Sequence, residues 1–513
     1  MPAMPLPNPD PGHMSAEAFR QRGREVIDLI ADYMQRVESL RVLPDVRPGD
    51  IAALLPLDAP EQPEAWDGIL ADIQRIVMPG LTHWQSPNFF AFFPANSSGP
   101  AILGDLLASG LGVQGMLWQT SPACTEIETR VLDWLGRAIG LPESFLSGGE
   151  GGGVIQGTAS EATLVAMLAG RERVRGGPAL RAGHRSSNGF SGLTVYTSTQ
   201  AHSSVIKAAM ISGIAASASD REHIRLIPTD AAFRMDSGAL EDALREDVSA
   251  GRVPCCVVAT LGTTGCGASD SIGEVGAAIA RACPDVPPWL HVDAAWAGAA
   301  LVCPEHQHLI GAIGQADSFC FNPHKWLLTN FDCDAMWVRD RRSLIGALSI
   351  APEYLRNAAS DSGAVIDYRD WQVPLGRRFR ALKLWFVLRH YGLAGLRAHI
   401  REHVRLGELF ESLVRADARF EIAAPRALSL VCFRLVQDNT GAPIADPDAA
   451  NRSLLERINA SGRAYLIHTV LPAAAGAPPR AVLRMAIGGT HTTETHVRNA
   501  WGLIQSCADD RPG

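Results

Sequence analysis

Hydrophobic positions in the first part of the chain recur with the period of an amphipathic helix. After Ser15, apolar residues return every three or four positions as far as Val37, and Ser15 can cap the helix that this pattern predicts. A second helix with one apolar face is predicted near 66–76. Each apolar face needs a partner, and the pattern fits packing on a second subunit as well as packing on the same chain.

From Gly153 onward, short apolar runs alternate with helical stretches. A strand at 154–156 precedes a helix that opens at 157–160, and further helices are predicted at 239–248 and 272–283. The other predicted strands are 193–198, 224–227, 255–260, 289–293, 318–321 and 335–338. This alternation predicts an α/β fold, in which a mostly parallel central sheet carries helices on both faces.

The last third of the chain has a different arrangement. Residues 349–362 have little to bury and predict a mobile loop, and a long helical region is predicted at 377–415. The strands expected after it are near 428–436, 465–470 and 482–486, with helices at 449–459 and 493–507, which indicates a small α+β domain. We therefore expect a disordered leader (1–13), an N-terminal helical segment (14–98), a large α/β domain (99–382) and a small C-terminal domain (383–513).

Composition and charge argue against several classes of function. A net charge of −8 without a basic face makes nucleic acid an unexpected partner. The ten cysteines lack metal-ligand spacing, so we predict no metal site and reduced, buried thiols, as in a cytoplasmic protein. The proline-rich leader is no signal peptide, and no stretch approaches the roughly 18 apolar residues that span a bilayer, so we expect no membrane contact.

The segment 84–94 is unusually aromatic, with four phenylalanines and one tryptophan in eleven residues. Its prolines, Pro87 and Pro94, disfavour a helix. Aromatic irregular segments are most often core, and the alternative is a wall of a pocket for a flat substrate.

Polar side chains follow the ends of the predicted parallel strands, where ligands bind in such sheets. These residues are His202, Thr264, Asp293 and Lys325. Lys325 comes after a strand and an Asn-Pro turn, where partial burial lowers the pKa of an amine and makes it a nucleophile. Small residues at 157–160 open a helix whose N-terminus favours a phosphate. Taken singly each residue is more often structural, but a lysine, an acid and a phosphate turn together suggest pyridoxal phosphate.

Several longer motifs occur in order along the chain. They are SPACTE at 121–126, QGTASEAT at 156–163, HVDAA at 291–295, NPHKW at 322–326 and PLGRRFR at 374–380. Together they resemble the group II pyridoxal-phosphate decarboxylases, and within them most closely the aromatic-L-amino-acid decarboxylases, over nearly the whole chain. The resemblance implies the aspartate aminotransferase-like fold type I of PLP-dependent enzymes, an obligate homodimer and an active site at the subunit interface.

The resemblance also implies a role for each site residue. Lys325 would bond covalently to the cofactor, Asp293 would keep the ring nitrogen protonated, and His202 would stack over the ring and help to hold the substrate carboxylate. The residues expected around the phosphate and the ring are Ala159, Ser160, Thr264, Asn322 and His324. Tyr354, in the predicted mobile loop, matches the tyrosine that the family uses to protonate Cα after carbon dioxide leaves.

The same resemblance makes an aromatic L-amino acid the expected substrate. The residues that match the family's aromatic wall are Trp84, Phe92, Phe93 and Pro94. Ala95 stands where animal members acting on catechols carry threonine, and Gly376 leaves room for a two-ring side chain. Gln114 and Met116 replace more apolar residues in a segment that, in the family, enters the neighbouring subunit's pocket. We rank tryptophan first, then 5-hydroxytryptophan or phenylalanine, with tyrosine and dihydroxyphenylalanine behind.

Two other functions stay open at this point. Aromatic aldehyde synthases of the same family couple decarboxylation to oxidative deamination, and typically replace the loop tyrosine with phenylalanine or the stacking histidine with asparagine. This chain keeps Tyr354 and His202, which favours simple decarboxylation. A catalytically inactive binding dimer would lack the lysine, the aspartate or the tyrosine, and all three are present.

Overall fold

The computed structural model describes residues 13–175, 192–350, 365–472 and 478–509. Within these ranges no helix is both long and apolar enough to cross a membrane. The same ranges contain no group of three or more His, Cys, Asp or Glu side chains that could hold a metal ion. All ten cysteines are free and buried, which confirms the prediction of buried thiols.

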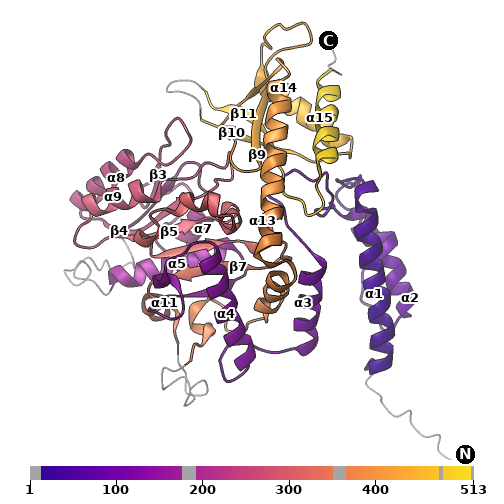
Figure 1. The fold of residues 1–513 in the computed structure, drawn as a ribbon, viewed down its shortest axis with the longest axis horizontal. Helices are drawn as coiled ribbons and strands as arrows, with labels where there is room; N and C mark the ends of the chain where they lie inside the picture. The colour runs from indigo at the N-terminus through magenta and orange to yellow at the C-terminus, as the bar shows by residue number, and fades with distance from the viewer. Residues whose placement is uncertain (1–12, 176–191, 351–364, 473–477, 510–513) are drawn as a thin grey trace, which may run out of the picture.

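A seven-stranded sheet forms the centre of the larger body (Figure 1). Its strands, in spatial order, are β1 (Gly152–Gln156), β7 (Asp334–Val338), β6 (Ser318–Phe321), β5 (Trp289–Asp293), β4 (Val253–Thr260), β2 (Leu193–Ser198) and β3 (Ile224–Ile227). Strand β7 alone runs antiparallel to its neighbours in this sheet. The mostly parallel α/β sheet predicted from the sequence is confirmed, with strand ends within two residues of the prediction.

Helices cover both faces of this sheet, so nearly every strand is buried on both sides. On one face lie α5 (Ala159–Arg175), α7 (Ser204–Ile211) and α11 (Arg341–Leu348). On the other lie α4 (Pro122–Ala138), α8 (Ser237–Ser249), α9 (Ile272–Ala282) and the first part of α13 (Arg380–Arg415). Alternate residues of each strand join one core or the other, as Cys320 and Phe321 do.

A second, antiparallel sheet forms the C-terminal part of the described chain. Its order is β10 (Ile467–Leu471), β11 (Arg480–Ala486), β9 (Leu430–Leu435) and β8 (Phe420–Ile422), and it packs with α14 (Pro447–Ala460), α15 (Glu494–Asp509) and α13. Helix α13 runs from the first sheet to the second (Figure 1). The long helical region predicted at 377–415 is confirmed as α13, with a kink at Gly392 (φ 60°, ψ 173°) that the sequence pattern did not show. The three-residue strand β8 escaped prediction because it is shorter than any periodic signal.

The N-terminal segment supplies α1 (Ala16–Arg36), α2 (Trp66–Asp72) and α3 (Gly99–Leu111). Ser15 Oγ accepts a hydrogen bond from Ala18 N at 3.1 Å, which confirms the predicted cap. Neither α1 nor α2 buries a residue in this chain, and both lie at the right of Figure 1, beyond α3 and below α15. Helix α3 exposes a row of leucines, Leu103, Leu106, Leu107 and Leu111.

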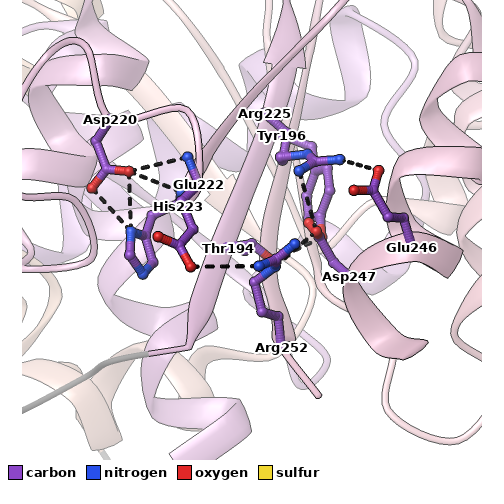
Figure 2. A network of polar contacts seen from close by, with 9 residues as sticks. All are labelled: Thr194, Tyr196, Asp220, Glu222, His223, Arg225, Glu246, Asp247 and Arg252. Carbon is purple, nitrogen blue, oxygen red and sulfur yellow. Dashed lines mark hydrogen bonds and ion pairs between the residues drawn. The ribbon is translucent and has the colours of Figure 1, made fainter. Parts of the chain in front are cut away.

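Asp247 anchors a polar network at the β3 edge of the large sheet (Figure 2). Its fully buried carboxylate accepts hydrogen bonds from Tyr196 Oη at 2.6 Å and from Arg252 Nε at 3.0 Å, and Arg225 lies 3.4 Å away. Burial raises the pKa of Tyr196 well above its ordinary value, and the hydrogen bond to Asp247 and the charge of that carboxylate raise it further. These bonds tie α8 to strands β2 and β3.

We predict that Asp247→Ala lowers the free energy of unfolding by about 3 kcal/mol, because it leaves buried donors without their acceptor. The control is Glu246→Ala, which removes an exposed partner of Arg225 and should cost less than about 1 kcal/mol. Urea unfolding curves of the two variants would contradict this account if their midpoints were equal.

Candidate active site

Lys325 lies at the carboxyl end of the parallel sheet, on the short helix α10 (Pro323–Trp326) that follows β6. Its backbone N–H bonds to Asn322 O at 3.0 Å, and its Nζ lies 5.4 Å from the centre of the Phe93 ring. Desolvation lowers the pKa of this amine, the charge of Asp293 is the largest effect that opposes it, and Arg484 adds to it. The result is an amine that gives up its proton more readily than an ordinary lysine.

Asp293 ends β5, one strand away from Lys325, and is almost completely buried. Its Oδ1 accepts a hydrogen bond from Ala295 N at 3.0 Å, and its backbone oxygen accepts one from Leu261 N at 2.8 Å. In the sheet it pairs with Thr260 on one side and Cys320 on the other. A carboxylate fixed in this way can hold a proton on a ring nitrogen placed over the strand ends.

His202 and Thr264 follow the ends of β2 and β4, and both are exposed. His202 Nδ1 accepts a hydrogen bond from Ser204 N at 3.2 Å, so in the neutral ring the proton is on Nε2. Desolvation of the ring lowers the His202 pKa, Asp293 opposes this shift and Lys325 adds to it. His202 therefore lies within electrostatic reach of both predicted catalytic groups.

The N-terminus of α5 meets the turn that carries Lys325. Ala159 N donates a hydrogen bond to Asn322 Oδ1 at 3.1 Å, and Ser160, next along the helix, is exposed. His324 Nδ1 accepts a bond from Cys333 N at 2.9 Å, which leaves its Nε2–H as a donor. Burial lowers the His324 pKa to about 3. Together the helix end, the Asn322 amide and the His324 imidazole provide neutral donors for an anion.

The aromatic segment is divided between core and site. Phe89 and Phe90 are buried, in agreement with the core interpretation. Phe93 stacks on Trp296 with ring centres 4.4 Å apart, and its ring lies below Lys325. Trp84 and Phe92 remain partly exposed and stack on each other at 5.6 Å.

The two residues after Phe93 differ in burial. Pro94 is buried, while Ala95 is half-buried and its carbonyl accepts a hydrogen bond from Gln85 Nε2 at 2.7 Å. The segment thus supplies one ring beside the amine, that of Phe93, and a separate, exposed pair of rings, those of Trp84 and Phe92.

The other predicted substrate residues form a separate group. Gln114 Oε1 accepts a hydrogen bond from Arg377 N at 3.2 Å, and it lies 3.4 Å from where a side chain on Gly376 would begin. Met116, nearby, is held through its carbonyl by Arg369 N at 3.1 Å. None of the contacts among the described residues joins this group to Lys325 of the same chain.

Sequence reasoning missed two charged residues at this site. Arg484 of β11 is buried, and its guanidinium lies 5.2 Å from the Phe93 ring centre, on the second sheet. Asp334, the first residue of β7, is also fully buried. A charged residue inside an apolar strand was the available signal in both cases. Tyr354 lies in 351–364, outside the described residues, so its predicted role keeps its sequence basis only.

Comparisons with known proteins identify the family. Residues 48–436 match the pyridoxal-dependent decarboxylase conserved domain. The chain belongs to the pyridoxal-dependent decarboxylases. It is 50% identical to the aromatic-L-amino-acid decarboxylase of Bos taurus over 498 residues, which cover 96% of this chain and 97% of that relative.

Solved structures agree with this membership. The structure of Oryza sativa TDC with PLP and tryptamine matches with a TM-score of 0.90 and 44% identity, over 96% of this chain and 98% of that one. Catharanthus roseus tryptophan decarboxylase in complex with L-tryptophan matches with a TM-score of 0.87 and 43% identity, over 97% and 99%. The chain is therefore a PLP-dependent carboxy-lyase of fold type I, and its reaction is the decarboxylation of aromatic amino acids.

The side chains present fit pyridoxal phosphate. An amine with a lowered pKa stands beside a buried carboxylate, as a covalently held aldehyde with a protonated ring nitrogen requires. The phosphate would be bound by a helix N-terminus and by neutral side-chain donors, so binding would not require a charged lysine or arginine to lose its water.

Three buried histidines make stability depend on pH. Burial lowers the pKa to about 4 for His291, about 3 for His324 and about 4 for His403, from an ordinary value of 6.5. The unfolded chain then binds more protons than the folded one below pH 6.5, so the free energy of unfolding falls as the pH falls. Urea unfolding of cofactor-free protein should show this loss as the pH falls below about 6.5. Asp270, whose pKa burial raises to about 6, acts in the opposite direction in this range, and the three histidines outweigh this single carboxyl group.

The matched variant for this prediction is His403→Gln. Its amide oxygen can still accept the bond that Trp326 Nε1 donates to His403 Nδ1 at 2.9 Å, but it cannot titrate. The slope of unfolding free energy against pH should become shallower by up to about one proton. An unchanged slope would show that His403 does not contribute.

Proposed function

We propose that the chain converts L-tryptophan to tryptamine and carbon dioxide in preference to other aromatic amino acids, with 5-hydroxytryptophan or phenylalanine next and tyrosine and dihydroxyphenylalanine behind. The observation that carries this ranking is the open space at Gly376. A side chain there would contact only Gln114 Oε1, at 3.4 Å, so the glycine leaves room beside a polar group. The likeness to a plant enzyme solved with L-tryptophan supports it.

The proposed division of labour starts from Lys325 and Asp293. Bound pyridoxal phosphate supplies an electron sink for the bond between Cα and the carboxylate. Lys325 would hold it covalently, and the lowered pKa of Lys325 favours this because the neutral amine is the nucleophile toward the cofactor aldehyde. Asp293 would keep the proton on the ring nitrogen. We assign the Nε2–H of His202, which is free to donate because Nδ1 accepts from Ser204 N, to the substrate carboxylate.

We also propose positions for the remaining groups. Phe93 forms the wall beside the amine, and Arg484, behind that ring, adds positive charge that keeps the Lys325 pKa low. Tyr354 is the proposed donor of the proton to Cα, and this assignment rests on the sequence.

We further propose a homodimer in which two copies complete each site. The exposed leucines of α3 and the unburied faces of α1 and α2 offer apolar surface for a second copy. The group formed by Gln114, Met116 and Gly376, which has no described contact with Lys325 of its own chain, would then face the partner's site. We keep the expected domain limits, 14–98, 99–382 and 383–513, as part of this proposal, and α13 crosses the last of them.

The substrate ranking is tested by an assay of carbon dioxide and amine from a panel of aromatic amino acids. We expect the highest kcat/KM with tryptophan, and Gly376→Ser should lower kcat/KM for tryptophan by about tenfold relative to that for tyrosine, because the pocket loses space for a second ring. The control is Gly346→Ser, at a position with no atom within 4 Å of the added carbon. A parent enzyme that prefers tyrosine, or an unchanged ratio in Gly376→Ser, would contradict the ranking.

The roles of Lys325 and Tyr354 are separated by product analysis. Lys325→Ala should abolish turnover, while Tyr354→Phe should keep the cofactor and divert product from amine to aldehyde, with molecular oxygen consumed as the oxidant and ammonia and peroxide released. If Tyr354→Phe made amine at the parent rate, Tyr354 would not be the proton donor. If the parent enzyme itself released peroxide and ammonia in step with carbon dioxide, it would be an aldehyde synthase.

A further inference from the structure

Asp334 is a fully buried carboxyl group that the roles above leave unused. It is the first residue of β7, and Phe321 of β6 pairs with the residue after it, so Asp334 lies beside the turn that leads to Lys325. Neither of its side-chain oxygens has a hydrogen-bond partner among the described residues. A carboxylate in that position would lack every donor that normally compensates for burial.

The residue opposite Asp334 also has a buried oxygen that lacks a hydrogen-bond donor. Register pairs it with Gln156 of β1, so the two side chains project from the same face of the sheet as direct neighbours. Gln156 Nε2 donates to Trp371 O at 2.8 Å, which fixes the orientation of the amide, while Gln156 Oε1 is buried and no described residue donates to it. Two groups of unsatisfied acceptors therefore stand side by side. A proton on Asp334 provides the one donor that both lack.

The surrounding charges favour the protonated form. Burial raises the pKa of Asp334 well above its ordinary value, and the negative charges of Asp293 on β5 and Glu161 on α5 raise it further. Lys325 on α10 is the opposing charge. The other titratable neighbours, Cys320 and Cys333, are buried thiols whose own pKa values are raised and which stay neutral. Of the two carboxyl groups, Asp293 has the N–H of Ala295 to stabilise an anion, and Asp334 has nothing equivalent.

We propose that Asp334 is a neutral carboxylic acid at physiological pH, that it donates its proton in a hydrogen bond to Gln156 Oε1, and that it is a positioning residue for the lysine and aspartate of the site. A neutral Asp334 leaves Asp293 as the one anion available to the ring nitrogen of the cofactor. An ionised Asp334 would add a second negative charge beside Lys325 and hold that amine as the ammonium, which cannot bond to the cofactor aldehyde. The proposal rests on the cofactor site but not on the identity of the substrate.

The direct test is infrared spectroscopy of cofactor-free protein carrying 13C-labelled aspartate. At neutral pH we expect the C=O stretch of a protonated aspartic acid in the wild type, lost in Asp334→Asn. Gln156→Leu should keep this band and shift it to higher frequency, because the acid then loses its acceptor. A wild-type spectrum without a protonated acid, or a band that survives Asp334→Asn, would overturn the proposal. A wild-type spectrum without a protonated acid decides against the proposal even if a variant fails to fold.

The second readout is the pH dependence of the visible absorption of the bound cofactor. Asp334→Asn replaces one neutral donor with another, so its absorption midpoint and its affinity for pyridoxal phosphate should match the wild type, within about twofold for affinity. Asp334→Leu has no donor and should bind the cofactor more weakly, and the asparagine variant is the rescue that separates donor from volume. A shift of about one pH unit in Asp334→Asn would mean that Asp334 carries a charge and is the counter-ion of Lys325, which contradicts the proposal. Since neither measurement involves turnover, its outcome is independent of the proposed substrate.

Discussion

The site depends on keeping one amine out of water. Desolvation of Lys325 destabilises its ammonium form, and the protein limits this effect with Asp293 nearby and strengthens it with Arg484 behind the Phe93 ring. Because a buried charge costs far more than a buried neutral group, each additional charge near Lys325 changes its reactivity. The placement of charge in this small volume therefore governs the chemistry more than any single contact does.

The two sheets together create that environment. In the parallel sheet, β5 and β6 are neighbours and end at the same edge, which places Asp293 next to the turn that carries Lys325. The N-terminus of α5 lies at that edge too. The antiparallel sheet contributes Arg484 from β11, whose guanidinium also bonds to Gly265 O at 2.9 Å, in the turn after β4. The rings of Phe93, Trp296 and Trp326 stack on one another beneath the site. Helix α13, which spans both sheets, fixes their relation (Figure 1).

Much of this could be predicted from the sequence because the signals are local. The strands at 193–198, 224–227, 289–293 and 318–321 have the bounds that apolar runs and turn residues indicated. The motifs located Lys325 and Asp293 just after two predicted strands. In a parallel sheet the carboxyl ends of strands lie at one edge, so the two residues are expected to lie close together.

The remaining features are tertiary and left no periodic trace. The break at Gly392 interrupts an apolar pattern that continues on both sides of it. Arg484 and Asp334 look like isolated charges until the fold places each beside Lys325. Phe92 and Phe93 are adjacent and equally apolar, yet one is exposed and the other buried, which only packing decides.

The measurement that tests the central claim most directly is reduction of the cofactor-loaded protein with borohydride, followed by peptide mass spectrometry. The chain has three lysines, Lys207, Lys325 and Lys383, so the attachment point is unambiguous. Lys383 is fully buried 3.7 Å from Asp105, and Lys207 is exposed on α7, so Lys325 is the lysine that lies in the site that fits the cofactor. The account predicts that the reduced cofactor adds its mass to the peptide that contains Lys325 and to neither of the others. Attachment to Lys207 or Lys383, or no attachment at all, would contradict it.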